Sequence, residues 1–208
     1  MDIHAPEGPA RSLKEFAIHI LIVTIGILIA LGLEGIRETV HEHHLIAETR
    51  ETFRQELGGD RDNLVLETAN VGEMRPKVDA MLRDFSELVK NPSSLQKRFD
   101  DLQPNFYFFR GTAWGGASSS GVLAYMKPEE VNNFADIYFG IQTYQTNSRQ
   151  TQLDWVATKS FFDSRQSFTA QDVAEGELRL RTFQLDLRAM AHLDQEFMQG
   201  LNRVLGPQ

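Results

Sequence analysis

The sequence contains no cysteine among its 208 residues, which excludes disulfide frameworks, thiol catalysis and cysteine-based zinc sites. It also lacks the Gly-x-Ser-x-Gly, phosphate-loop, dinucleotide-binding and His-Glu-x-x-His motifs of common enzyme classes. A fold without disulfides is held by packing alone, and such folds occur in the cytosol and in the periplasm. We therefore expect a protein that is not an enzyme and that carries no cofactor.

Basic charge is also scarce in most of the chain. Two of the 21 Lys and Arg residues and three of the 29 Asp and Glu residues precede Glu34, so the rest of the chain has a net charge of −7. Acidic surfaces repel phosphate backbones and anionic head groups. We expect protein partners and no nucleic acid, and the length suits one domain with a single hydrophobic core.

Long apolar runs are absent except for one near the N-terminus, at residues 16–33. At a rise of about 1.5 Å per residue, a helix over residues 13–36 crosses a hydrocarbon core of about 30 Å. We expect three parts: a short tail (1–11), a transmembrane helix in the lipid bilayer (12–35) and an extramembrane helical domain (36–208).

A cleavable signal sequence is the alternative reading of this run. Ala30 and Gly32 have the small-x-small spacing of a cleavage site. The apolar core of a signal sequence is about 7–15 residues long, however, and this run is longer. The pattern favours a permanent anchor.

The basic residues around the run predict its orientation. Arg11 and Lys14 precede it, whereas Arg37 and then Arg50 follow it. The positive-inside rule favours an N-terminus on the cytoplasmic side. We expect a single-pass protein of the inner membrane, with the larger domain in the periplasm.

Helical periodicity dominates the chain after the anchor, and no sustained two-residue alternation marks strands. One seam advances in steps of three and four residues and predicts a long helix over residues 36–90. Gly58, Gly59 and Pro76 predict a bend or break within it. The polar members of the seam favour an irregular antiparallel helical bundle of the all-α class. The seam comprises His43, Ile46, Arg50, Phe53, Leu57, Asp60, Leu64, Glu67, Val71, Met74, Val78, Met81, Phe85 and Leu88.

Two further long helices are expected at residues 128–163 and 170–205. The first begins with Pro128 in a favoured first-turn position, and the second follows a capping pattern at Thr169 to Asp172. Residues 93–126 should form short, broken helices, with Ser93 or Ser94 as a cap. The stretch at residues 115–121, rich in small residues, is interpreted as a turn.

An aromatic cluster lies within this broken region. In the first interpretation its rings fill the core at one end of the bundle, because aromatic side chains bury large apolar areas. In the second they form a patch that docks a partner. The cluster comprises Phe106, Tyr107, Phe108, Phe109 and Trp114.

Two features of the apolar run could carry function. Gly26 and Ala30 form a small-x-x-x-small pair, which allows another membrane helix to approach closely. His19 could ligate a haem or pigment, or it could reach the membrane interface, because polar residues inside membranes are often functional.

Glu38, His41 and His44 could contribute to a metal site after the run, because Glu-x-x-His is the spacing of carboxylate-bridged metal bundles. Such bundles need matching ligands from other helices. His192 has no glutamate three residues before it, so a second motif is missing. We expect a solvated face near the head groups.

Several short sequence motifs are similar to those of a known family. They are IGILIAL at residues 25–31, TAW at 112–114, SSG at 119–121, a Leu-x-x-Met and IY at 137–138. They resemble an uncharacterised bacterial family of small single-pass membrane proteins, with an anchor of this type and a helical domain. The resemblance implies an anchored helical protein with no established enzymatic role.

Three functions are consistent with these features. The favoured one is a non-catalytic interaction or accessory subunit of a membrane protein complex, with self-association as a further possibility. The second is a periplasmic ligand sensor that signals through a partner, with a pocket among Gln145, Ser148, Gln152 and the charged seam residues of the helix at residues 36–90. The third is a metal-binding bundle that uses the cluster at residues 41–44.

Overall fold

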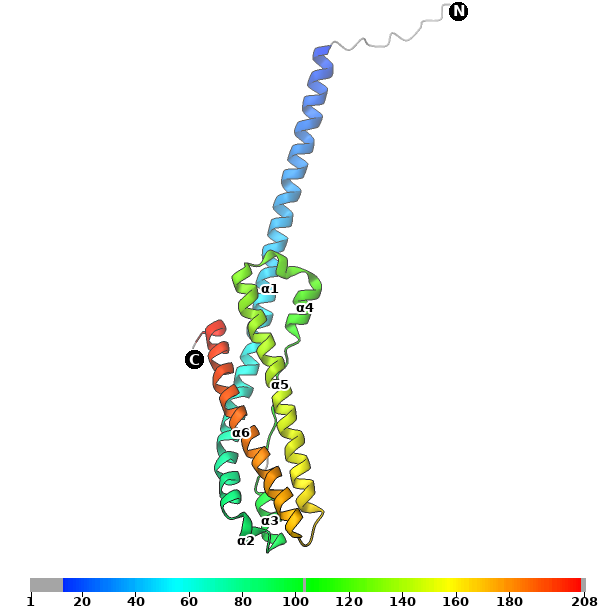
Figure 1. The fold of residues 1–208 in the computed structure, drawn as a ribbon. Helices are drawn as coiled ribbons and strands as arrows, with labels where there is room; N and C mark the ends of the chain where they lie inside the picture. Colours follow the sequence, from blue (N-terminus) through cyan, green and yellow to red (C-terminus); the bar gives the residue numbers. More distant parts are fainter. Residues whose placement is uncertain (1–12, 103, 207–208) are drawn as a thin grey trace, which may run out of the picture. The chain divides into compact units, whose positions relative to one another are not determined.

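The computed structural model describes residues 13–102 and 104–206, so the expected tail 1–11 lies outside the described residues. All regular structure within these ranges is helical, which confirms the all-α expectation (Figure 1). The chain divides into two compact units, Met1–Ala47 and Glu48–Gln208, which are described separately. The elements are α1 (Leu13–Arg83), α2 (Phe85–Leu88), α3 (Pro92–Asp100), α4 (Ala113–Ser120), η1 (Val122–Tyr125), α5 (Pro128–Asp163) and α6 (Ala170–Leu205).

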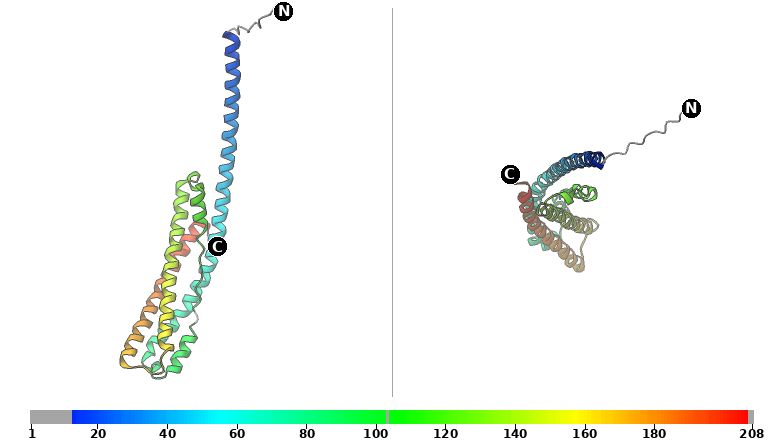
Figure 2. Two further views of the ribbon diagram at one scale, coloured as in Figure 1. Left: turned by 90° about the vertical axis from the view of Figure 1, so that its right-hand side faces the viewer. Right: turned by 90° about the horizontal axis from the view of Figure 1, so that it is seen from above.

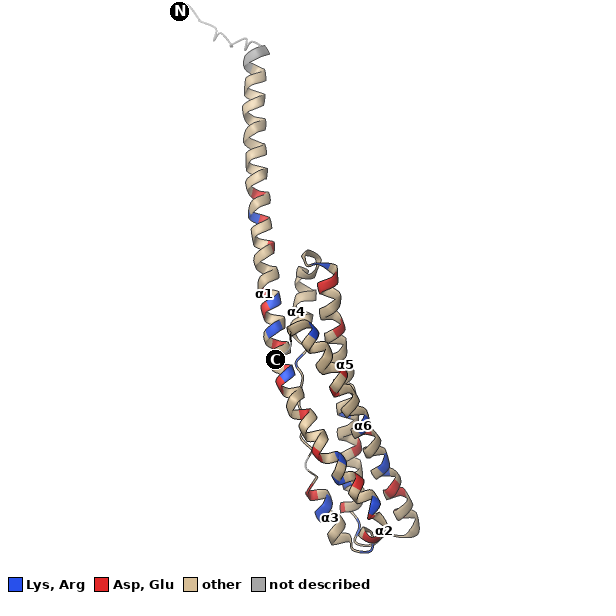
Figure 3. Cartoon of the chain, turned by 90° about the vertical axis from the view of Figure 1, so that its left-hand side faces the viewer, with Lys and Arg blue, Asp and Glu red and all other residues tan. Residues whose placement is uncertain are grey.

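The first unit contains the apolar part of α1. Every residue from 16 to 40 is exposed, and none of the residues 16–33 is charged, so the ribbon stays tan there in Figure 3. Among the described residues, α1 is the one helix that is long and apolar enough to cross a membrane. The expected long apolar helix near the N-terminus is therefore confirmed.

The second unit is a bundle, and the predicted seam lies in its core, mostly on α1 and from Phe85 on α2. The apolar seam residues from Phe53 to Phe85 are all buried. Asp60 and Glu67 are buried in the same seam, each about 1% exposed. Arg50 and Leu88 are only partly buried, and His43, the first residue of the seam, is exposed. The helical period therefore identified the buried face of α1, including its two acidic positions.

Of the expected bend or break within α1, the break is not observed, because the helix continues through Gly58, Gly59 and Pro76. A proline ring clashes with the carbonyl four residues earlier, which here belongs to Gly72. Pro76 and Gly72 are both exposed, so water can satisfy the carbonyl that loses its partner. Burial of the nearby Leu57 and Leu64 offsets the low helix propensity of the glycine pair.

Helices α5 and α6 run antiparallel and pack closely (Figure 1). Two glycines of α6 permit this contact. A Cβ atom on Gly176 would lie 2.6 Å from Phe162 Cζ, and one on Gly200 would lie 2.8 Å from Ile137 Cδ1. The predicted capping pattern forms a capping box, in which the Thr169 side chain accepts a bond from Asp172 N. These local signals correspond to the observed helix starts at Pro128 and Ala170.

Two short elements differ from the expectation. The cap of α3 is Asn91 instead of Ser93 or Ser94, because Pro92 takes the first helical position and the Asn91 side chain accepts a bond from Ser94 N. The stretch interpreted as a turn forms α4. Glu56 of α1 accepts bonds from the first amides of that helix, Thr112 N at 3.1 Å and Ala113 N at 3.0 Å. This contact fixes α4 in a way that no local sequence pattern showed.

Candidate functional site

A non-helical segment at residues 104–112, here called the strap, lies between α3 and α4 and runs beside α1 and α5 (Figures 1 and 2). Carboxylates of α1 hold its amide groups. Tyr107 N donates to Glu67 Oε2 at 3.2 Å, and Arg110 N donates to Asp60 Oδ1 at 3.0 Å. The two carboxylates therefore accept hydrogen bonds from strap amides, which have no helical carbonyl partner because the strap is not helical.

Two asparagines of α1 complete the attachment by donating to carbonyl groups of the strap. Asn63 Nδ2 donates to the Phe108 carbonyl at 2.9 Å, and Asn70 Nδ2 donates to the Asn105 carbonyl at 2.6 Å. The amides and the carbonyls of the strap are thus bound by two sets of side chains on the same helix.

The spacing of these contacts follows from helix and strand geometry. Asp60 and Glu67 are seven residues apart, as are Asn63 and Asn70, and seven helical residues rise about 10.5 Å. Their partners in the strap are three residues apart, and three extended residues span about 10 Å. The residue numbers of the strap partners decrease as the residue numbers along α1 increase, so the strap lies antiparallel to α1. Its contacts with α1 repeat every two helical turns.

The two strap-binding carboxyls lie in surroundings that favour their neutral forms. Burial raises the pKa of Asp60 to about 6, and the charge of nearby Glu56 adds to this shift. Burial raises the pKa of Glu67 to about 7, and Asp194 contributes in the same direction. The backbone bonds from the strap partly offset both shifts, because they stabilise the charged forms.

A third buried carboxyl lies on α6. Asp194 is about 1% exposed, and its Oδ1 accepts a bond from the Tyr144 hydroxyl at 2.5 Å. Burial also raises the pKa of Asp194. The core of the bundle therefore has a polar middle with Asp60, Glu67 and Asp194, between apolar and aromatic ends.

The five aromatic residues of the predicted patch are distributed over different surroundings. Phe109 is buried with its ring centroid 4.7 Å from that of Tyr144, and the Phe109 carbonyl accepts a bond from Gln145. Phe106 and Tyr107 are partly buried, whereas Phe108 is 83% exposed. Trp114 stacks on the rings of Phe53 and Tyr138. Phe109 and Trp114 thus contribute to the core, and Phe108 is the cluster's strongly exposed ring.

The candidate residues of α1 before the bundle are all exposed. They are His19, Gly26, Ala30, Glu38, His41 and His44. Within the part of the chain that the structure describes, no group of three or more His, Asp or Glu side chains is arranged to hold a metal ion.

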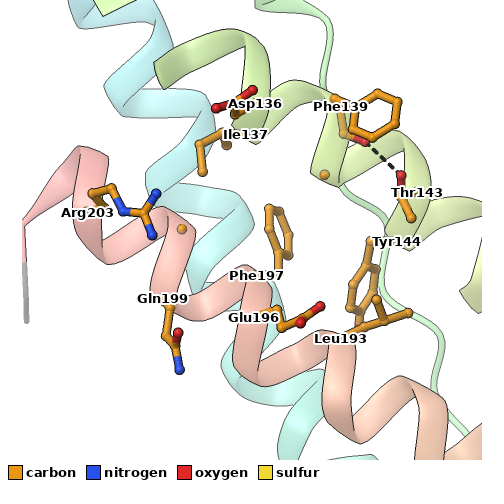
Figure 4. A pocket seen from close by; sticks show the side chains of 12 residues that line it. Asp136, Ile137, Phe139, Thr143, Tyr144, Leu193, Glu196, Phe197, Gln199 and Arg203 are labelled. Carbon is orange, nitrogen blue, oxygen red and sulfur yellow. Dashed lines mark hydrogen bonds between the residues drawn. The ribbon is translucent and has the colours of Figure 1, made fainter. Parts of the chain in front are cut away.

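A groove of about 430 Å³ opens between α5 and α6 (Figure 4). Its apolar lining includes Ile137 and Phe197, together with the backbone of two glycines, Gly140 and Gly200. Its charged lining residues are Asp136, Glu196 and Arg203. Phe139 also lines the groove and is 72% exposed.

Sequence reasoning missed the strap and the groove. A signal for the strap was present, because Asn63 and Asn70 repeat the seven-residue spacing of Asp60 and Glu67 on a neighbouring face of α1. No comparable pattern marks the groove, because its residues come from two helices whose facing positions depend on their packing.

Comparison with known proteins gives no relative for this chain. No family model matches the sequence, and no curated protein or solved structure matches it at a significant level.

Proposed function

We propose that the chain is a single-pass, membrane-anchored interaction or accessory subunit without catalytic activity. The main support for this proposal is that every residue from 16 to 40 is exposed, although the segment is mostly apolar. Large exposed apolar surfaces mark membrane or protein interaction sites. A lipid bilayer would cover this segment, and the bundle would remain available for protein contacts.

The proposed location is the inner membrane, with the N-terminus inside and the bundle in the periplasm. The basic residues before the run support this orientation. A signal sequence is also an apolar helix near the N-terminus, so the proposal includes retention of residues 1–32 in the mature protein. The resemblance to single-pass bacterial membrane proteins points in the same direction.

The orientation can be measured directly because the chain has no cysteine. A Ser167→Cys variant carries one thiol in the exposed connection between α5 and α6. A membrane-impermeant maleimide should label this thiol in intact spheroplasts. Labelling only after the membrane is permeabilised would contradict the proposed orientation.

Affinity purification from native membranes in mild detergent tests the accessory role. We expect a fixed set of larger membrane proteins to co-purify with the chain and to be identified by mass spectrometry. Recovery of the chain without any reproducible partner other than itself would contradict this role.

The sensor hypothesis is the second candidate, and the groove between α5 and α6 supports it, since its volume lies within the usual range of ligand sites. The groove differs from the pocket expected from the sequence, because Ser148 is buried and Gln145 binds the Phe109 carbonyl. A rise in the melting temperature with one small metabolite would favour this candidate. Stoichiometric iron or manganese in the purified protein would instead favour the metal-binding hypothesis.

A further inference from the structure

The groove between α5 and α6 combines exposed apolar surface with charges of both signs. Phe139 is 72% exposed on α5, beside the glycine-lined groove. Asp136 on α5 and Arg203 on α6 both line the groove, and neither forms an ion pair with another described residue. Such a surface resembles the centre of a protein interface, where aromatic and arginine side chains are enriched.

The packing of α5 against α6 determines which groove residues share a level. Gly200 on α6 lies beside Ile137 on α5. The Tyr144 hydroxyl of α5 donates a hydrogen bond to Asp194 of α6. Because the helices are antiparallel, Arg203 lies about two residues, or roughly 3 Å, from the level of Asp136. The acid and the base therefore lie on different helices at nearly the same height.

We propose that this groove is the interface of a parallel two-fold dimer, in which a second copy of the chain is the occupant. In that arrangement α5 of each copy faces α6 of the other. Arg203 then meets Asp136 of the second copy. This contact occurs twice because of the symmetry, and Phe139 packs against the glycine-lined surface of the other copy.

Two arguments favour a second copy over an unrelated helix. A two-fold interface uses the same patch on both subunits, so the patch must be self-complementary, and this groove contains the acid and the base at matching levels. The second argument rests on the proposed function. Copies anchored in one membrane are tethered at the same end of α1, which favours a parallel pair and raises the effective concentration of the second copy.

A charge-swap experiment on the full chain tests the interface. The molar mass of the protein in detergent is measured by light scattering with size-exclusion chromatography, for the original chain and for Arg203→Asp, Asp136→Arg and the double variant. We expect a dimer for the original chain and at least about tenfold weaker dimerisation for each single variant, since like charges then face each other. The double variant should restore the dimer.

Matched controls separate the groove from other surfaces. Phe139→Glu should give a monomer, whereas Leu185→Glu should not, although Leu185 is 61% exposed on α6 outside the groove. Circular dichroism checks that each variant folds. Gly26→Leu with Ala30→Leu tests the anchor as an alternative source of dimers.

A monomeric original chain would overturn the proposal, as would a dimer that depends on the anchor residues and is insensitive to the groove variants. Carbonate extraction of membranes is measured in parallel. A groove-dependent dimer that is released by carbonate would support the interface and contradict the anchoring, so the two proposals can fail separately.

Discussion

The two parts of α1, the apolar part at residues 16–40 and the part within the bundle, differ in how their side chains are buried. Before the bundle its apolar residues are exposed all round, without a buried stripe between residues 16 and 40. Within the bundle only the seam is buried, and that seam includes two carboxyls. A helix that is apolar on every face requires an apolar environment on every face, whereas an amphipathic helix needs only one packed neighbour surface. The difference supports the proposed lipid environment of the first part, whereas the second part packs against protein.

The largest effect is expected from charge in the first part. Ile22→Lys combined with Ile29→Lys should release the protein from membranes, because each lysine near the centre of a membrane helix costs about 3 kcal/mol. The matched control places the same charges on the bundle part of the same helix. Val65→Lys with Leu66→Lys should leave membrane retention unchanged, because both side chains are about half exposed. Equal behaviour of the two variants in carbonate-washed vesicles would contradict the comparison.

A core truncation should have the next largest effect. Phe53 is fully buried, with its ring centroid 4.6 Å from that of Phe134. Phe53→Ala should destabilise the bundle by about 3–5 kcal/mol in urea unfolding, because it removes a ring and leaves a cavity. Leu178→Ala, at a side chain that is 65% exposed, should change stability by less than about 0.5 kcal/mol. A loss below about 1 kcal/mol for Phe53→Ala would contradict the assigned core.

The buried carboxyls predict that stability falls as the pH rises. The pKa of Glu67 is about 7 in the folded bundle, above its ordinary value of 4.5, so the folded state binds the proton more tightly. The stabilisation is fully present below about pH 4.5 and is lost as the pH rises to about 7. For Glu67 alone this amounts to roughly 3 kcal/mol, and Asp60 acts in the same direction up to about pH 6.

Glu67→Gln separates this charge effect from the hydrogen bond to the strap. The amide oxygen can still accept from Tyr107 N, but the side chain can no longer ionise. The variant should be more stable than the original chain at pH 8 and should show a flatter pH dependence of the free energy of unfolding between pH 5 and 8. Stability of the original chain that increases over this range would contradict the assignment of a buried, proton-binding carboxyl.

The smallest effect is expected at the asparagine contacts of the strap. Asn63→Ala and Asn70→Ala each remove one hydrogen bond to a strap carbonyl and should each cost about 1 kcal/mol. Asn132→Ala, at an exposed position of α5, serves as the control for the change in helix propensity. Hydrogen exchange of the strap amides should accelerate in the first two variants only.

Much of the helical fold could be predicted from local patterns. The three-and-four spacing located the buried face of α1, including Asp60 and Glu67, because a helix repeats every 3.6 residues regardless of its neighbours. Pro128 and the Thr169 capping pattern indicated where α5 and α6 begin, because capping depends on residues within one turn.

The strap and α4 could not be predicted in the same way. The strap has no internal hydrogen-bond pattern, and its conformation depends on side chains of α1 that are about 40 to 50 residues away in sequence. The start of α4 depends on Glu56, which is 56 residues from Thr112. The groove depends on the register between α5 and α6, which the sequence of either helix alone does not determine.

The intact mass of the protein recovered from carbonate-washed native membranes tests the proposed anchor most directly. A permanent anchor predicts that the chain stays in the membrane pellet with a mass of about 23.6 kDa, which corresponds to all 208 residues. Recovery in the supernatant, or a shorter product that begins after Gly32, would contradict it.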